Sequence, residues 1–318
     1  MLCSGDRDSL NVAGFGYQVL WMNSETARLS EIQYKSIMKC VETLYILPDI
    51  DTTGIRSAIR LGLQYLDIRF IWLPESLREY KDNRGKPRKD LRDYVELYPE
   101  RKDFQKLINV AMPLRFWDEV TKEEGKRYYF NDEHALFFLN ANGFGRIEYK
   151  NTKGKSIFVQ IEDNVVHEVE PEEIKDYVLD FMEKRYLPIP LRNVVRKPNQ
   201  LSEATLKGLK KLKLDFTDYD SESQYLFFRN KTIKVTGEEI KEFRPGDTSQ
   251  CVWEEKVIPH HFRLLPEPFH ITWNKDTDSY DIDIYNQDSS FFCYLINASR
   301  VHWQTELELS LIHISEPT

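Results

Sequence analysis

The sequence lacks the features that would place it in a membrane or in a disulfide-rich scaffold. No apolar run approaches the roughly 20 residues that a membrane-spanning helix requires, and no charged flank with an apolar signal core opens the chain. The four cysteines, Cys3, Cys40, Cys251 and Cys293, lie far apart and form no CxxC pair. A disulfide framework and a zinc ribbon are therefore not predicted, and we expect free thiols in a cytoplasmic protein without a membrane partner.

The chain also lacks an excess of positive charge and a complete nucleotide-binding loop. Its formal net charge is -8 at pH 7, so any contact with DNA is expected to come from a local basic patch. The GKS of residues 154–156 matches only the end of a P-loop, because Tyr149 stands where the upstream glycine is required. We interpret it as a turn, so the ATPase of a helicase, if the parent protein has one, would lie beyond residue 318.

An acidic motif is the most informative feature that the sequence does contain. The segment Tyr45–Gly54 (YILPDIDTTG) is an apolar run that leads into Asp49 and Asp51. Residues two apart on a strand point to the same side, so both carboxylates are expected to face one ion. Their hard oxygens suit Mg²⁺, or Mn²⁺ in its place. A capped acidic turn without an ion is the alternative that these two residues leave open.

The residues around this motif predict an α/β unit over positions 1–97. Strands are expected at Tyr17–Trp21, before Asp49 and at Asp67–Leu73, with helices over 31–42 and after a cap at Thr52 or Thr53. Strands that alternate with helices predict βαβ crossovers and a parallel sheet with helices on both faces. Only residues 1–3 precede the first turn, so the first strand is expected to be truncated.

The most basic stretch of the chain lies between the third of these strands and residue 93. Gly85 and Pro87 indicate a loop, and a loop of this charge beside carboxylates is suited to phosphate contact, for which we select Arg84, Arg88 and Lys89. A solvated loop whose charges balance nearby carboxylates is the alternative. The basic residues are Arg78, Lys81, Arg84, Lys86, Arg88, Lys89 and Arg92.

Together these segments resemble a Toprim domain, the metal-dependent fold of bacterial-type primases, topoisomerases and some nucleases. Three matches carry the resemblance: Gly5 and Asp8 in the first turn (SGDRDSL), the pair Asp49 and Asp51, and the late segment Lys89–Tyr94, with Asp90 and Asp93. The likeness is greatest to the primase-helicases of phages and mobile elements, and it covers about a third of the chain. It implies a DNA-replication enzyme that binds Mg²⁺, DNA and nucleoside triphosphates, works with a helicase domain and, if encoded by a phage, acts in the host cytoplasm.

The sequence departs from this family at Ser4, where the family has a glutamate that is its presumed acid/base group. Asp6, two residues later, is the candidate replacement, so Asp6 and Asp8 take the catalytic role that the resemblance implies. Two alternatives stay open: a non-catalytic scaffold or DNA-binding module of a replication complex, and a Toprim nuclease.

Beyond residue 97 we expect smaller α+β domains and no catalytic residues. A linker over 98–125 is predicted to be helical between Arg101 and Val120 and broken at Met112–Pro113. An α+β linker domain is expected over 126–200, with a hairpin of Gly145–Lys150 and Ser156–Glu162 and a helix that has Pro171 in its first turn. A further α+β domain that would precede a helicase is expected over 201–308, with a helical start after Leu201 and a hairpin across Tyr225–Thr236. Residues 309–318 resemble translated adapter sequence and are expected to have no evolved role.

Overall fold

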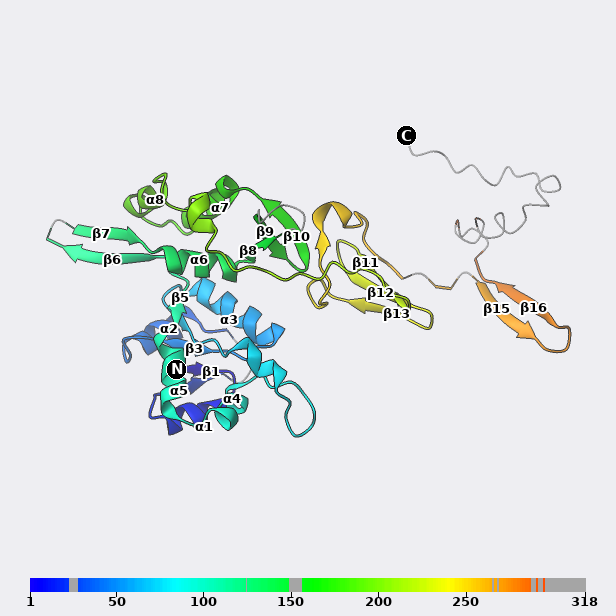
Figure 1. The fold of residues 1–318 in the computed structure, drawn as a ribbon, viewed down its shortest axis with the longest axis horizontal. Helices are drawn as coiled ribbons and strands as arrows, with labels where there is room; N and C mark the ends of the chain where they lie inside the picture. The colour runs from blue at the N-terminus through cyan, green and yellow to red at the C-terminus, as the bar shows by residue number, and fades with distance from the viewer. Residues whose placement is uncertain are drawn as a thin grey trace. The chain divides into compact units, whose positions relative to one another are not determined.

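The computed structural model describes residues 1–22, 28–123, 125–148, 156–264, 266–267 and 269–286, with residues 290 and 294. The chain forms two compact units, residues 1–260 and the residues from 261 onward, and each is described by itself (Figure 1). The domain limits predicted at 97, 125 and 200 fall inside the first unit. The segment 309–318 and the predicted GKS turn, apart from its last residue, lie outside the described residues.

A five-stranded sheet organises the first part of the chain. Its strands are β1 (Leu2–Cys3), β2 (Leu20–Trp21), β3 (Tyr45–Leu47), β4 (Arg69–Phe70) and β5 (Met112–Pro113), in the spatial order β2-β1-β3-β4-β5. The first four strands run parallel, and β5 is antiparallel to β4. The predicted α/β class with a parallel-containing sheet is confirmed, and the short β1 lies inside the sheet, paired on both sides.

Helices cover both faces of this sheet because successive strand residues point in opposite directions. Leu2 of β1 and Ile46 of β3 belong to the core formed with α2 (Glu31–Met38) and α3 (Thr52–Gln64). Cys3 and Leu47, their neighbours in sequence, belong to the core on the opposite face. That core contains residues of α1 (Asp6–Gly14), α4 (Leu91–Leu97) and α5 (Arg101–Asn109).

Two predicted helices are shorter than expected. Helix α2 ends at Met38, four residues before the predicted end. The linker is helical only in α5, which ends at Asn109 and buries Phe104 completely. The helical prediction is wrong beyond that point, because Met112 and Pro113 pair with β4 and Trp117–Lys122 forms a hairpin, β6, with β7 (Gly125–Phe130).

The next part of the first unit is α+β, as predicted. Helices α6 (Asp132–Ala141), α7 (Pro171–Lys184) and α8 (Ile189–Val195) accompany a four-stranded sheet. The predicted hairpin of β8 (Phe144–Glu148) and β9 (Ser156–Glu162) is confirmed, and β10 (Val165–Val169) and β14 (Val252–Trp253) complete the sheet in the order β14-β10-β9-β8. Phe138 and Val178 join the core that contains Ile46, so the two sheets share one apolar interior.

Shorter elements make up the remainder. Two 3₁₀ turns, Glu75–Glu79 and Glu254–Lys256, flank the sheets, and the helix predicted after Leu201 is confirmed only in α9 (Glu203–Leu206). The predicted hairpin of β11 (Ser223–Phe227) and β12 (Thr232–Thr236) is confirmed, and β13 (Ile240–Phe243) adds a third strand. The second unit contains the hairpin of β15 (Phe269–Asn274) and β16 (Ser279–Ile284). Within the described residues, no helix is both long and apolar enough to cross a membrane.

Candidate functional site

The turn between β3 and α3 presents both residues of the acidic pair. Asp51 is the N-cap of α3, where its carboxylate accepts a hydrogen bond from the Gly54 N–H at 2.8 Å. Asp49 is only 6% exposed, and a Cβ at Gly54 would lie 2.6 Å from the Asp49 carbonyl oxygen, so the turn requires glycine there. The prediction that Asp49 and Asp51 lie on the strand is wrong, as is the cap at Thr52 or Thr53, because β3 ends at Leu47.

Lys89 places its ammonium group between the two carboxylates. Its Nζ lies 2.5 Å from Asp51 Oδ2 and 3.3 Å from Asp49 Oδ2. The backbone holds this arrangement, because the Ile50 N–H donates to the Lys89 carbonyl at 3.0 Å. The hydrogen bond to Asp51 raises the pKa of Lys89. Burial opposes ionisation of Asp51, yet Lys89 and the Gly54 N–H outweigh it and lower the pKa of that carboxyl. Asp49 and Asp51 therefore face one shared cation, here a lysine.

The two late family-motif residues have a clear structural role at the start of α4. Asp90 is the N-cap and accepts a hydrogen bond from the Asp93 N–H at 2.8 Å, while Asp93 accepts one from the Lys89 N–H at 2.8 Å. This capping box fixes the backbone that carries Lys89. Burial, followed by the charge of Asp93 and Asp49, raises the pKa of Asp90 against the effect of the capping hydrogen bond.

Asp8 is a buried carboxyl on α1 that faces the same region. It is 6% exposed and accepts a hydrogen bond from the Arg92 N–H at 3.2 Å. Burial, with the charges of Asp90 and Asp49, raises the pKa of Asp8 to about 7, although the Arg92 N–H acts in the opposite direction. A carboxyl that is half protonated near neutral pH is typical of functional sites.

The first turn does not bring Asp6 into this arrangement. Asp6 is exposed at the start of α1 and accepts a hydrogen bond from the Arg7 N–H at 2.8 Å. Gly5 is the extended N-cap, and Ser4 Oγ donates to the Leu47 carbonyl at 3.5 Å. In the described part of the chain, no three His, Cys, Asp or Glu side chains converge as metal ligands. The described residues therefore do not bring Asp6 or Asp8 together with Asp49 and Asp51 as one group of metal ligands. Asp49 and Asp51 alone share the Lys89 ammonium.

The basic loop forms one wall of a groove beside Lys89. The groove has a volume of about 790 Å³, and Arg84 extends into solvent from an Asp82 turn, with Nε 3.1 Å from Asp82 Oδ2. Arg88 differs, because its side chain is 12% exposed and contacts Glu96 at 2.7 Å. Arg88 therefore forms an ion pair with a residue of α4. Its contact with phosphate stays a prediction. The lining includes Arg7, Asp51, Thr52, Arg78, Asp82, Arg84, Lys86, Arg88, Lys89, Arg92 and Glu96.

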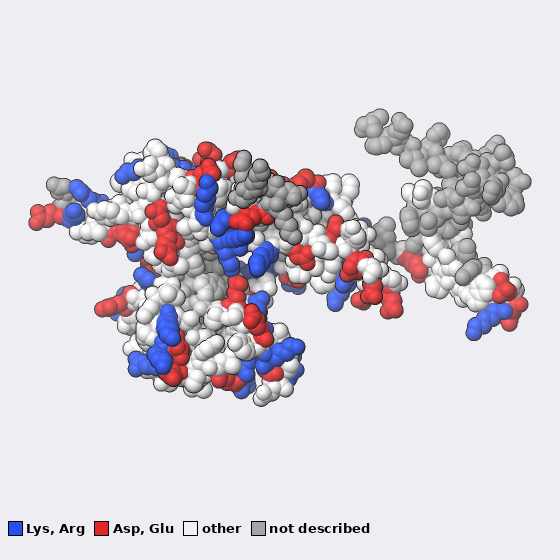
Figure 2. Space-filling model, in the orientation of Figure 1, with Lys and Arg blue, Asp and Glu red and all other residues white. Residues whose placement is uncertain are grey.

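Basic and acidic side chains are intermixed over the face of the molecule drawn in Figure 2. This fits the net charge of -8, and it restricts any phosphate contact to a small area.

The sequence did not indicate how Lys89 and Asp8 are used. Lys89 was predicted to contact phosphate, yet its ammonium donates a hydrogen bond to the carboxylate of Asp51, 38 positions earlier. Asp8 accepts a hydrogen bond from the backbone N–H of Arg92, 84 positions later. The acidic pair next to a basic loop was the available signal for the first contact. Nothing in the local sequence signals the second.

Comparison of the chain with models of protein families, with curated proteins and with solved structures found no match. The assignment of a role to this site therefore depends on its own chemistry.

Proposed function

We propose that the first α/β part of this chain is a Toprim-like module that binds Mg²⁺ and the phosphates of nucleotides or nucleic acid, as part of a DNA primase-helicase. The observation that carries this proposal is the placement of the Lys89 ammonium between Asp49 and Asp51. Two carboxylates that already share one ammonium group supply the negative charge that a divalent ion in its place would need. The partners proposed with this function are DNA, nucleoside triphosphates and a replicative helicase domain.

The donor set fits Mg²⁺. This ion is usually held by one or two carboxylates, with water and substrate phosphates as the other ligands, so three protein ligands are not required. Asp49 and Asp51 would hold it, and it would neutralise phosphate oxygens and orient an attacking hydroxyl.

The chain's own residues supply the remaining functions. Lys89 carries a positive charge at the acidic pair and lines the groove, and Arg84 extends from the same loop toward solvent. Both would attract a phosphate backbone in the proposed function. Asp8, with its pKa of about 7, can hold or release a proton near neutral pH in the same region.

Metal binding is tested by titration calorimetry with Mn²⁺. We expect the double variant Asp49→Asn with Asp51→Asn to lose binding, because each change removes a negative charge from the shared centre. Asp281→Asn with Asp283→Asn is the matched control: it removes the same charge from exposed residues with the same i, i+2 spacing on β16. Unchanged affinity in the first variant would contradict the metal site.

One observation favours a second function, that of a non-catalytic scaffold derived from a Toprim domain. Ser4 occupies the position of the family glutamate, and its hydroxyl is directed to the Leu47 carbonyl. A serine there supplies no ionised acid/base group. Template-dependent primer synthesis separates the two functions, and metal-dependent cleavage of DNA or RNA without added nucleotides would instead indicate a nuclease.

A further inference from the structure

A second pocket lies on the other side of the β3–α3 turn from the groove. Its volume is about 690 Å³, which is within the usual range of roughly 300–1,000 Å³ for small-ligand sites. Pro48 and Gly54 of the turn line this pocket, whereas Asp51 and Thr52 line the groove. The two sites therefore share the turn but none of these side chains.

The position of the pocket in the sheet favours ligand binding. Ser4 follows β1 and Pro48 follows β3, so the pocket opens at the carboxyl ends of two adjacent parallel strands. The chain leaves β1 toward β2 on one side and leaves β3 toward β4 on the other. This is the topological switch point, at which open α/β sheets generally bind their ligands.

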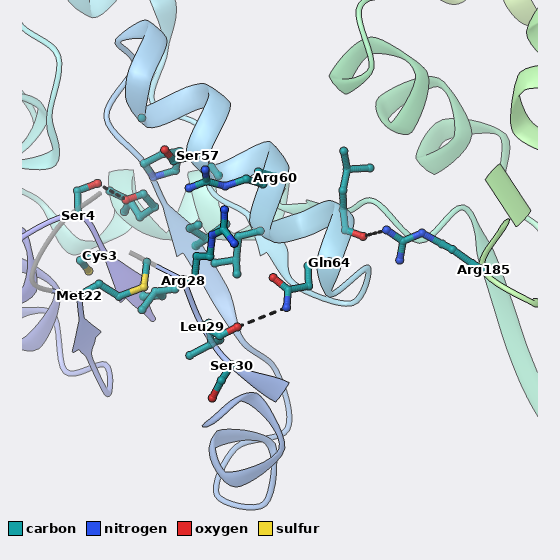
Figure 3. A pocket seen from close by; sticks show the side chains of 18 residues that line it. Cys3, Ser4, Met22, Arg28, Leu29, Ser30, Ser57, Arg60, Gln64 and Arg185 are labelled. Atoms are coloured by element: carbon teal, nitrogen blue, oxygen red, sulfur yellow. Dashed lines mark hydrogen bonds between the residues drawn. The ribbon is translucent and has the colours of Figure 1, made fainter. Parts of the chain in front are cut away.

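Three arginines determine the charge of the pocket. Arg28 precedes α2, Arg60 lies on α3 and Arg185 follows α7, and no Asp or Glu is among the described residues that line the site. In Figure 3 the Arg28 side chain points toward that of Arg60, which extends past it toward Ser57, while Arg185 lies past Gln64. Like charges that line one pocket repel one another, so the arrangement favours a bound anion.

The contacts of these arginines differ. Arg185 donates to the Leu63 carbonyl and stacks on the Phe181 ring at 4.6 Å, which leaves it as a fixed charge at one end. Arg28 has no hydrogen bond or ion pair with any of the residues that the structure describes. Planar guanidinium groups and serine hydroxyls suit phosphate oxygens, which accept several hydrogen bonds in fixed directions.

Apart from Ser4, Ser30, Ser57 and Gln64, the remainder of the lining is apolar. Leu2 and Ile46 of the sheet and Leu61 of α3 form the floor, and each is almost fully buried. An inorganic anion would contact only the polar lining, whereas the base and sugar of a nucleoside would also contact the apolar lining.

We propose that this pocket binds a nucleoside phosphate, with Arg28 and Arg60 at the phosphate and the apolar floor against the nucleoside. The site is distinct from Asp49, Asp51 and Lys89, and it does not require a metal ion. The pocket would give the module a second nucleotide site. This proposal does not depend on whether the acidic pair binds Mg²⁺.

Fluorescent ADP, titrated into the full chain in EDTA, tests this proposal because chelation removes any metal-dependent binding. We expect saturable binding that unlabelled ADP reverses, with inorganic phosphate and adenosine each at least about tenfold weaker as competitors, since each retains only part of the contacts. Absence of binding, or competition by phosphate equal to that by ADP, would overturn the proposal.

Variants then assign the binding to the pocket. Arg28→Gln with Arg60→Gln should weaken ADP binding at least about tenfold, because two charge-assisted contacts are lost. Arg127→Gln with Arg196→Gln is the matched control, because it removes the same charge from exposed residues that line neither site and should leave the affinity unchanged. Arg84→Gln with Arg92→Gln reports separately on the groove. Ser57→Leu fills the pocket without a change in charge and should also reduce binding, which keeps the test valid if the double variant is unstable. Loss of binding only in the groove variant would refute the pocket and leave the proposed phosphate groove in place.

Discussion

Asp8→Asn should stabilise the protein at alkaline pH. The Asp8 carboxyl is 6% exposed, and its pKa rises from 3.8 to about 7 in the folded chain. Asparagine has almost the same shape, keeps an oxygen that can accept the hydrogen bond from the Arg92 N–H, and carries no charge. The substitution therefore removes the cost of a buried, repelled carboxylate while it retains the contact.

The size of the effect follows from proton linkage. A carboxyl with a raised pKa binds more protons in the folded than in the unfolded state between pH 3.8 and about 7, so wild-type stability falls as pH rises through that window. The shift is about three pKa units at about 1.4 kcal/mol each, which gives a difference of up to about 4 kcal/mol above pH 7 and almost none below pH 4.

Urea denaturation in EDTA, from pH 4 to pH 8, measures this difference. The free energy of unfolding of Asp8→Asn minus that of the wild type should be near zero at pH 4 and should increase to its limit above pH 7. Asp6→Asn is the matched control, because it removes an exposed carboxylate from the same first turn and should cost less than about 1 kcal/mol through the lost helix-dipole contact. A variant no more stable than the wild type at pH 8 would show that Asp8 is not a buried, repelled carboxylate.

Two further substitutions test the packing of the site. Lys89→Met should destabilise the protein by about 1–2 kcal/mol at pH 7, between the values for exposed and buried ion pairs, because Asp49 and Asp51 lose their cation. Since the pKa of Asp51 is lowered in the folded state, this difference should diminish as pH falls toward 3, and a loss independent of pH would contradict the ion pairing. Gly54→Ala should cost about 1–3 kcal/mol in thermal unfolding, because its Cβ would meet the Asp49 carbonyl at 2.6 Å. Gly14→Ala, which meets nothing within 4 Å, should be neutral or stabilising, and equal effects of the two alanines would refute the steric argument.

Much of the local structure was predictable because it depends on residues close together in sequence. The apolar run before Asp49 predicted β3, and the helical spacing from Ile55 to Leu66 predicted α3. The hairpin of β8 and β9 and helix α7 followed in the same way from alternation and from a proline in the first turn. These patterns record which side of an element is buried, and that is a local property.

Helix ends and the limits of the first sheet were less predictable. A helix was expected on both sides of a break at Met112–Pro113, but these two residues pair with β4, and the chain continues as a strand there. The choice depends on a partner more than 40 positions away, which no local pattern contains.

The sequence by itself determined that this chain would contain a parallel α/β unit with Asp49 and Asp51 where a central strand leads into a helix. Only the tertiary structure decided that Lys89 lies between those carboxylates, that Asp8 is buried near them, and that Arg28 and Arg60 line one separate pocket. The physical reason is that charge interactions and burial depend on distances in space, whereas the patterns of a sequence record only distances along the chain.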